Sequence, residues 1–161
     1  MTKLFLHRTI ILLILFAQLL LSCGQNQQSN KTTSNESISS KGNQILIETF
    51  SVFPPEIDGC ACYFSIDQTG FRNDKYIYAD DYGNNAFVSI NGVMTKFLLS
   101  KSDTLPGERS VETFINDKYE ITIDVKQVGQ LDETWQKTGT IKIKSKDGKE
   151  IIKNIYGECG C

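Results

Sequence analysis

The chain has 161 residues, of which 40% are apolar and 22% are charged, and its 17 basic and 19 acidic side chains give a formal net charge of −2. Its only histidine, His7, lies in a segment that we expect to be removed on export, so histidine-based catalytic triads and metal sites are excluded from the mature protein. The slightly acidic balance argues against nucleic acid as a partner, because nucleic-acid binding needs a basic surface.

Residues 1–22 have the three-part pattern of a secretory signal peptide. Lys3, His7 and Arg8 form a short basic head, and a nearly unbroken apolar run follows over residues 10–21. A permanent membrane-spanning helix needs about 20 apolar residues, so this run is too short to cross a bilayer comfortably. We therefore expect an export signal over residues 1–22.

The segment Leu20-Leu21-Ser22-Cys23 resembles the lipobox of bacterial lipoproteins: an apolar residue, two spacers of which the second is small, and then cysteine. The resemblance implies cleavage before Cys23, a diacylglyceryl thioether on its sulfur, and an N-terminus acylated with a chain such as palmitate. Two or more acyl chains hold a protein stably on a membrane, because each buried methylene contributes about 0.8 kcal/mol. The membrane is thus an expected partner, bound through the lipid on Cys23.

Gly24 follows the predicted lipidation site. In enteric-type bacteria an Asp at this position marks retention at the inner membrane, so the resemblance favours the outer membrane, on its periplasmic or its surface face. The alternative is an ordinary cleaved signal with a chance cysteine, or a signal that stays uncleaved.

A polar segment separates the predicted lipid anchor from the rest of the chain. From Gln25 to Gln44 the residues are mostly Gln, Asn, Ser, Thr and Lys, and Ile38 is the only large apolar one. Such a segment cannot bury enough apolar surface to offset its ordering entropy. We therefore divide the mature chain into a lipidated cysteine with a flexible tether (23–44) and a folded domain (45–161).

The apolar residues of the folded domain recur with a period of two, which is typical of β-strands. Tyr119, Ile121, Ile123 and Val125 alternate with polar residues without exception, and residues 141–144 repeat the pattern. The closely spaced turns predict an all-β fold, an antiparallel meander of about nine strands. The pattern does not choose between a small barrel and a sandwich.

The strongest local prediction is a hairpin at Asn91-Gly92, the favoured pair for a two-residue type I′ turn. The turn predicts the pairs Ile90 with Val93, Val88 with Thr95, and Ala86 with Phe97 on one face, which places Val93 and Phe97 in the core. Phe87 falls on the opposite face, where exposure would make it a candidate for contact with a partner.

Two segments, 104–111 and 129–137, are predicted to be long loops, since the first contains Pro106-Gly107 and neither alternates clearly. Trp135 lies in the second. We expect it either to cover one end of a barrel or to contact a partner.

Four cysteines remain after Cys23, arranged as two Cys-x-Cys pairs. In an extended strand the two sulfurs of such a pair lie on one face, roughly 6 to 7 Å apart, which is too far for a bond within the pair. Exported proteins permit disulfides, so we predict two bridges between the pairs. Antiparallel neighbouring strands would join Cys60 to Cys161 and Cys62 to Cys159, whereas parallel neighbours would exchange the partners.

Two other kinds of site remain open. The cysteines Cys60, Cys62, Cys159 and Cys161 could instead ligate zinc or cuprous copper, although one intervening residue is a poor match to the usual zinc spacing. A redox-active dithiol is a further option, although the Cys-x-x-Cys motif is absent. A second cluster, formed by Asp80, Asp81, Asn84 and Asn85 around a glycine, could hold calcium or could simply form a tight turn.

The segments 59–62, 86–92 and 157–161 are together similar to a group of small bacterial envelope proteins with no assigned activity. That resemblance implies no mechanism and no cofactor. The residues themselves offer no catalytic constellation, so we expect a lipid-anchored, non-enzymatic β domain that binds an envelope protein or a small ligand, or serves a structural role. The alternatives are a thiolate metal-binding lipoprotein and an inhibitor of a cell-wall lytic enzyme, the latter an analogy with small β-barrel lipoproteins.

Overall fold

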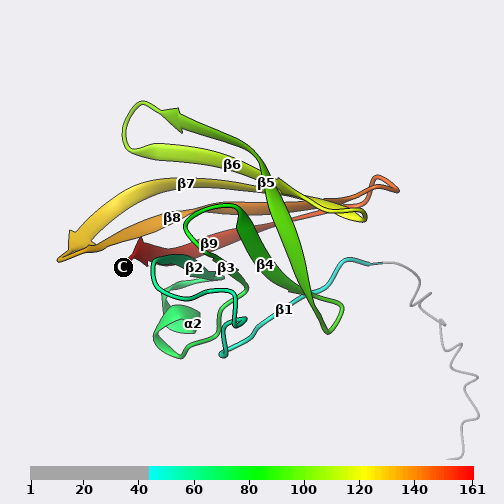
Figure 1. The fold of residues 1–161 in the computed structure, drawn as a ribbon, viewed down its shortest axis with the longest axis horizontal. Helices are drawn as coiled ribbons and strands as arrows, with labels where there is room; N and C mark the ends of the chain where they lie inside the picture. Colours follow the sequence, from blue (N-terminus) through cyan, green and yellow to red (C-terminus); the bar gives the residue numbers. More distant parts are fainter. Residues whose placement is uncertain (1–43) are drawn as a thin grey trace, which may run out of the picture. The chain divides into compact units, whose positions relative to one another are not determined.

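The computed structural model describes residues 44–161 (Figure 1). The predicted signal peptide, the predicted lipidation site Cys23 and the predicted tether up to residue 43 lie outside the described residues. Within the described part of the chain, no helix is long and apolar enough to cross a membrane.

Residues 44–161 form a closed antiparallel barrel. Its elements are β1 (Ile47–Glu48), β2 (Ala61–Ser65), α2 (Gln68–Arg72), β3 (Tyr78–Asp80), β4 (Asn85–Ile90), β5 (Val93–Leu105), β6 (Arg109–Ile115), β7 (Tyr119–Leu131), β8 (Thr134–Ser145) and β9 (Glu150–Gly160). The order β4-β3-β2-β9-β8-β7-β6-β5 closes on itself, because β5 also pairs with β4, and β1 adds a ninth strand on β4. The predicted all-β antiparallel fold is confirmed, and of the two alternatives the barrel is the one formed.

The barrel has two ends, which we name the base and the mouth. The base is where β1 pairs with the end of β4, and its turns are 91–92, 116–118 and 146–149. The mouth carries the turns 81–84, 106–108 and 132–133 and the C-terminus, and it lies to the left in Figure 1. Strand direction alone assigns every turn to one end or the other.

The barrel interior is filled by the residues whose alternation predicted the strands. Ile121, Ile123 and Val125 on β7 are at most 4% exposed, and Ile141 and Ile143 on β8 are fully buried. Burying one such side chain contributes about 1.5 to 3 kcal/mol. The largest side chains in the same core are Phe64, Tyr78, Phe97 and Phe114.

The hairpin between β4 and β5 has the predicted turn and register. Asn91 and Gly92 have φ values of +51° and +79°, the left-handed conformation that a type I′ turn needs. The pairs are Ile90 with Val93, Val88 with Thr95, and Ala86 with Phe97, as predicted. Phe97 is fully buried, but the placement of Val93 in the core is wrong: it is 64% exposed, because it stands at the tip of the hairpin beyond the core.

Phe87 is only 2% exposed, so its prediction as an exposed partner contact is wrong. Strand β4 is buried on both faces over residues 86–90, and the irregular segment 49–59 reaches the outer side of the β4–β5 pair. Glu56 in this segment forms an ion pair with Lys96 at 4.0 Å, and the Lys96 ammonium lies 5.6 Å from the centre of the Phe87 ring.

The prediction of two long loops is wrong, because both segments consist mostly of paired strands. Segment 104–111 belongs to the β5–β6 hairpin, and segment 129–137 to the β7–β8 hairpin, so the connections shrink to residues 106–108 and 132–133. Trp135 is a half-buried residue of β8, paired with Gln130 and Cys159 rather than placed in a loop. These hairpins extend past the core, so solvent reaches both of their faces and no apolar alternation marks them as strands.

An aromatic cluster fastens the irregular segment and helix α2 to the outside of the barrel. Tyr63 on β2 stacks on Phe71 of α2, with ring centres 5.7 Å apart, and contacts Phe53 of the crossing segment at 5.3 Å. Asp67 caps the helix by accepting a hydrogen bond from the Gly70 N–H at 2.7 Å. The cluster comprises Phe50, Phe53, Tyr63, Phe71, Tyr76 and Tyr156.

Gly157 allows β9 to approach β2. A Cβ atom at this position would lie 2.0 Å from the carbonyl oxygen of Tyr63 and 2.7 Å from the Phe64 ring. Because backbone and a packed core ring occupy the space, every other residue is excluded unless the strands separate.

We expect Gly157→Ala to lower the free energy of unfolding by more than about 3 kcal/mol, since β2 and β9 must move apart. Gly70→Ala is the matched control, because a Cβ there meets nothing closer than 3.4 Å; its effect should stay within about 1 kcal/mol. Urea denaturation measures both, and equal losses would contradict the proposed close approach.

Candidate functional site

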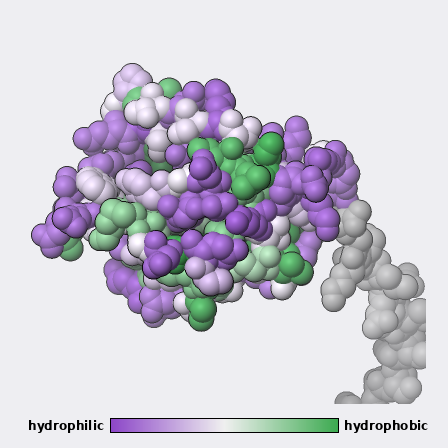
Figure 2. All heavy atoms as spheres, in the orientation of Figure 1, coloured by the Kyte–Doolittle hydropathy of each residue, from purple (hydrophilic) through white to green (hydrophobic). Residues whose placement is uncertain are grey.

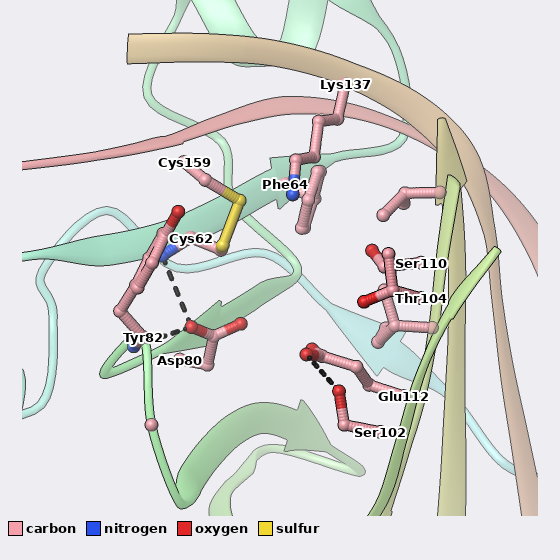
Figure 3. Close-up of a pocket in the computed structure, with 13 residues that line it drawn as sticks. Cys62, Phe64, Asp80, Tyr82, Ser102, Thr104, Ser110, Glu112, Lys137 and Cys159 are labelled. Carbon is pink, nitrogen blue, oxygen red and sulfur yellow. Dashed lines mark hydrogen bonds between the residues drawn. A yellow bond between two sulfur atoms is a disulfide. The ribbon is translucent and has the colours of Figure 1, made fainter. Parts of the chain in front are cut away.

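The mouth contains a cavity of about 170 Å³ that opens to solvent (Figure 3). One wall carries the Cys62–Cys159 disulfide, Asp80 and Tyr82, and the facing wall carries polar residues of β5 and β6. The polar lining on the second wall consists of Ser102, Thr104, Ser110 and Glu112, and Lys137 reaches in from β8. The site is therefore a polar cavity at the end of an apolar barrel.

The first wall is a row of neighbouring residues on three strands. Cys62 on β2 pairs with Cys159 on β9 to one side and with Asp80 on β3 to the other. In an antiparallel sheet, directly paired residues point to the same face, so the disulfide and the carboxyl both face the interior. Sheet register alone thus brings residues 62, 80 and 159 together.

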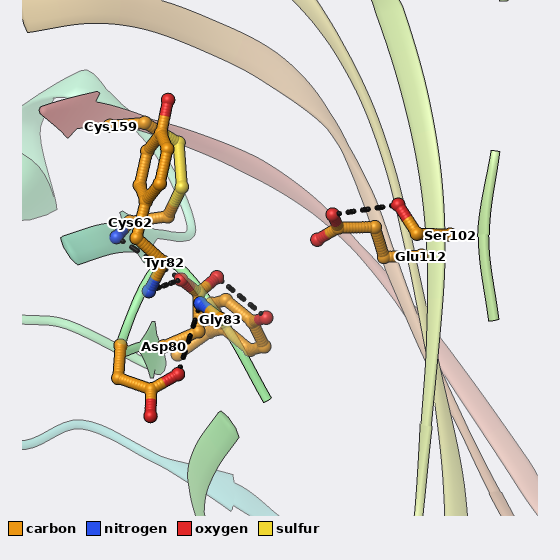
Figure 4. The surroundings of a disulfide bond; sticks show 9 residues. Cys62, Asp80, Tyr82, Gly83, Ser102, Glu112 and Cys159 are labelled. Carbon is orange, nitrogen blue, oxygen red and sulfur yellow. Dashed lines mark hydrogen bonds between the residues drawn. A yellow bond between two sulfur atoms is a disulfide. The ribbon is translucent and has the colours of Figure 1, made fainter. Parts of the chain in front are cut away.

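The four cysteines form two disulfides, Cys60–Cys161 and Cys62–Cys159, with Cα atoms 3.9 and 4.0 Å apart. The predicted bridges are confirmed, with the pairing expected of antiparallel neighbours. Figure 4 shows the inner bridge beside Tyr82 and Asp80. With all four sulfurs in disulfides, the described residues offer no thiolate to zinc or copper.

Asp80 is the buried carboxyl of the mouth, with 4% of its surface exposed. Its Oδ1 accepts hydrogen bonds from the N–H groups of Tyr82 (2.8 Å) and Cys62 (3.3 Å), and its Oδ2 accepts one from the Tyr78 hydroxyl (2.9 Å). Burial raises the pKa of Asp80 to about 6, although these hydrogen bonds lower it in part; nearby Glu112 raises it further. Burial also raises the pKa of Tyr78 well above its usual value.

Glu112 supplies a second carboxyl on the facing wall. It pairs with Ser102 across β5 and β6 and accepts a hydrogen bond from the Ser102 hydroxyl at 3.2 Å (Figures 3 and 4). Lys137 is the only basic residue that lines the cavity within the described part of the chain. Two carboxyls against one ammonium group give the ionised cavity an excess of negative charge.

The predicted calcium residues form a turn instead of a shared ion site. Asp81 Oδ1 accepts hydrogen bonds from the N–H groups of Gly83 (3.1 Å) and Asn85 (2.9 Å), and Asp80 points into the barrel. Partial burial acts to raise the pKa of Asp81, but the hydrogen bonds from Asn85 and Gly83 outweigh it and hold that pKa below its usual value. Within residues 44–161, no three His, Cys, Asp or Glu side chains are grouped to hold a metal ion.

Sequence reasoning missed most of this site. Asp80 was predicted as a calcium ligand, and Cys62 and Cys159 were predicted only as disulfide cysteines. The other polar residues of the cavity, Ser102, Glu112 and Lys137, were not predicted as site residues. One signal was present: Ser102, Thr104 and Ser110, Glu112 occupy alternate positions on either side of Pro106-Gly107. Read as a hairpin, this alternation would have placed them on one face.

Comparison with models of protein families, with curated proteins and with solved structures finds no match to this chain.

The raised pKa of Asp80 predicts that the domain becomes more stable as the pH falls. A carboxyl whose folded-state pKa exceeds its unfolded value of about 3.9 stabilises the fold when protonated, and this contribution is lost as the pH rises through about 6. We expect the free energy of unfolding to rise by about 1 to 2 kcal/mol between pH 8 and pH 5. No histidine lies in residues 44–161 to titrate in this range.

Asp80→Asn should flatten the pH dependence of the free energy of unfolding. Asp81→Asn should leave that dependence unchanged, because the pKa of Asp81 is lowered and lies below the range from pH 5 to pH 8. Urea denaturation across the pH series measures both variants. A pH dependence that persists in Asp80→Asn would assign it to another group.

The disulfides predict non-additive losses of stability. Each bridge closes nearly the same loop, with sequence separations of 101 and 97. Cys60→Ala/Cys161→Ala should therefore cost about 1 kcal/mol, whereas removal of all four cysteines should cost about 4 to 5 kcal/mol, because only then does the unfolded chain gain the long loop's entropy. Thermal unfolding of the two variants measures this, and equal losses would show that the bridges do not share one constraint.

Proposed function

We propose that the chain is a lipid-anchored envelope lipoprotein, held in the membrane through acylated Cys23, and that its barrel is a non-enzymatic binding module with the mouth as its binding site. The observation that carries the proposal is the cavity at the mouth, with a buried carboxyl on one wall and a second carboxyl on the other. The lipobox resemblance and the polar segment that follows it support the anchor.

The lining of the cavity favours a cationic group as its occupant. Above pH 6 Asp80 is mostly ionised, so Asp80 and Glu112 together outweigh the charge of Lys137. The cavity, about 170 Å³, is smaller than the roughly 300 Å³ at which sites for drug-sized ligands begin. A single lysine or arginine side chain matches this size and charge better than a complete cofactor.

The rim of the mouth favours a protein as the molecule that supplies this side chain. Tyr82, Leu105, Val128 and Leu131 surround the mouth on three turns and hairpin ends, with exposed fractions of 51%, 36%, 56% and 65%. Exposed apolar residues around a polar cavity are typical of a surface that a protein partner covers. The proposed ligand is thus a basic side chain on an envelope protein.

Binding fits the mouth better than catalysis does. The two oxygens of Asp80 already accept three hydrogen bonds from the protein, so the carboxyl is held as a fixed charge that attracts a cation and is poorly placed to take up a proton as a general base. Turnover of cell-wall fragments by the purified protein would contradict this part of the proposal.

Inhibition of a cell-wall lytic enzyme is the second candidate function. The exposed apolar tips of Leu105 and Leu131 favour it, because an inhibitor must cover a surface of its target enzyme. A lysozyme activity assay with increasing amounts of the purified protein tests it, and unchanged lysis at every ratio excludes that target.

Thiolate metal binding loses support, because the cysteines are oxidised.

The lipid anchor is tested by the mass of the N-terminal peptide of the membrane-bound protein. We expect cleavage before Cys23 and the added mass of acyl chains on that residue. Cys23→Ser should abolish acylation and, since the lipobox resemblance ties cleavage to this cysteine, should leave residues 1–22 attached. A Cys23→Ser variant that is still cleaved after Ser22, or that still carries acyl mass on its N-terminal peptide, would contradict the anchor.

Binding at the mouth is tested by NMR titration of the detergent-solubilised mature chain with Nα-acetyl-lysine methylamide. Amide shifts should concentrate on residues that line the mouth, and Nα-acetyl-norleucine methylamide, which lacks the charge, should cause none. Glu112→Gln should weaken binding about tenfold, as expected when one charged partner is removed. Glu120→Gln, at the base of the barrel, is the control, and equal weakening by both variants would contradict binding at the mouth.

A further inference from the structure

The base of the barrel is where the described chain begins. Leu46 donates its N–H to Asn91 Oδ1 at 3.0 Å and accepts a hydrogen bond from the Asn91 N–H at 2.9 Å. These bonds fix the start of the domain beside the tip of the β4–β5 hairpin. Residues 23–43, which join the proposed lipid anchor to the domain, therefore attach at the base and not at the mouth.

Exposed apolar side chains gather at the same end. Leu46, Val93 and Met94 are 51%, 64% and 39% exposed. A groove of about 490 Å³ runs between the β4–β5 hairpin and the turn 116–118, and its apolar residues include Val93, Met94 and Tyr119. More apolar surface continues up the outside of β5, where Leu98 pairs with Ile115 and both are exposed; Figure 2 shows apolar side chains over this strand in a largely polar surface.

We propose that the base of the barrel rests on the lipid bilayer that holds Cys23, with Val93 and Met94 in the interface between headgroups and acyl chains. This inference rests on the lipid anchor of the proposed function. Once the chain is anchored, contact of the base with the same bilayer is intramolecular, so weak apolar contacts suffice to orient the domain. A protein partner is not covalently linked to this end of the molecule, whereas the bilayer is linked to it through the lipid on Cys23.

The charges at the base determine the kind of lipid surface. Lys96 and Lys118 line the groove together with Asp117. The Glu48 carboxylate lies close by, within 4.0 Å of the position that a Cβ atom of residue 92 would take. Basic and acidic groups are nearly balanced, so the contact is chiefly apolar and does not require anionic lipid. It also places the mouth at the far end, pointing away from the membrane.

Tryptophan fluorescence in vesicles tests this orientation, because the only tryptophan, Trp135, lies near the mouth. In a Trp135→Phe background, the acylated chain carrying either Met94→Trp or Leu131→Trp is reconstituted into phosphatidylcholine vesicles with spin-labelled lipid. The tryptophan introduced by Met94→Trp should lose emission to the quencher, because an interfacial apolar residue lies about 5 to 10 Å into the boundary between headgroups and acyl chains. The one introduced by Leu131→Trp, at the mouth, should lose none.

Equal quenching at the two positions, or none at position 94, would overturn the inference. The mass of the N-terminal peptide is measured on the same sample: a chain without acyl groups on Cys23 would overturn the proposed anchor, and the orientation with it. An acylated chain with an unquenched position 94 would overturn the orientation alone.

Hydrogen exchange on the chain with its native tryptophan provides a second measurement, in which no residue of the folded domain is replaced. Amides of residues 92–94 should exchange more slowly in the acylated chain in vesicles than in a chain of residues 24–161, which has neither the signal segment nor the lipidated cysteine. Amides of residues 106–108, in a turn at the mouth, should be unchanged. Slowing confined to residues 106–108 would show that the mouth, and not the base, meets the membrane.

Discussion

The pairing of β2 with β9 is the contact on which the rest of the structure depends. It joins β2, the first strand of the closed barrel in chain order, to β9, the last, and with the β4–β5 pairing it closes the barrel. Gly157 permits the close approach, and both disulfides cross the same strand pair. Because this pairing spans about 100 residues of sequence, the covalent bridges favour a contact whose loop-closure entropy is otherwise large.

The same pairing places the chemistry at the mouth. Cys62 lies between Cys159 and Asp80, so the strand pair that closes the barrel also sets a carboxyl against the disulfide inside it. Burying that carboxyl costs stability at neutral pH, and the hydrogen bonds from Tyr78, Tyr82 and the Cys62 N–H offset only part of the cost. A group that weakens the fold at neutral pH is consistent with a role in binding, which is the role that we propose for it.

The sequence predicted those parts of the fold in which one face of a strand is dry and the other wet. Ile121, Ile123 and Val125 alternate for this reason, and Asn91-Gly92 determined a hairpin down to its register. The predictions failed where that contrast disappears. Phe87 is buried where Lys96 and a distant irregular segment meet, which no local pattern indicates, and Trp135 lies in a hairpin that solvent reaches on both faces. The mouth was missed for the same reason, since its hydroxyl and carboxyl residues have the composition of a loop.

The most direct test of the mouth as the binding site is photo-crosslinking in the native envelope. A photoreactive amino acid replaces Leu131 at the mouth or Val93 at the base, and the products are identified by mass spectrometry. We predict one protein adduct from position 131 that Glu112→Gln weakens, and no protein adduct from position 93. The same protein captured from position 93, or an adduct from position 131 that Glu112→Gln leaves unchanged, would contradict the account.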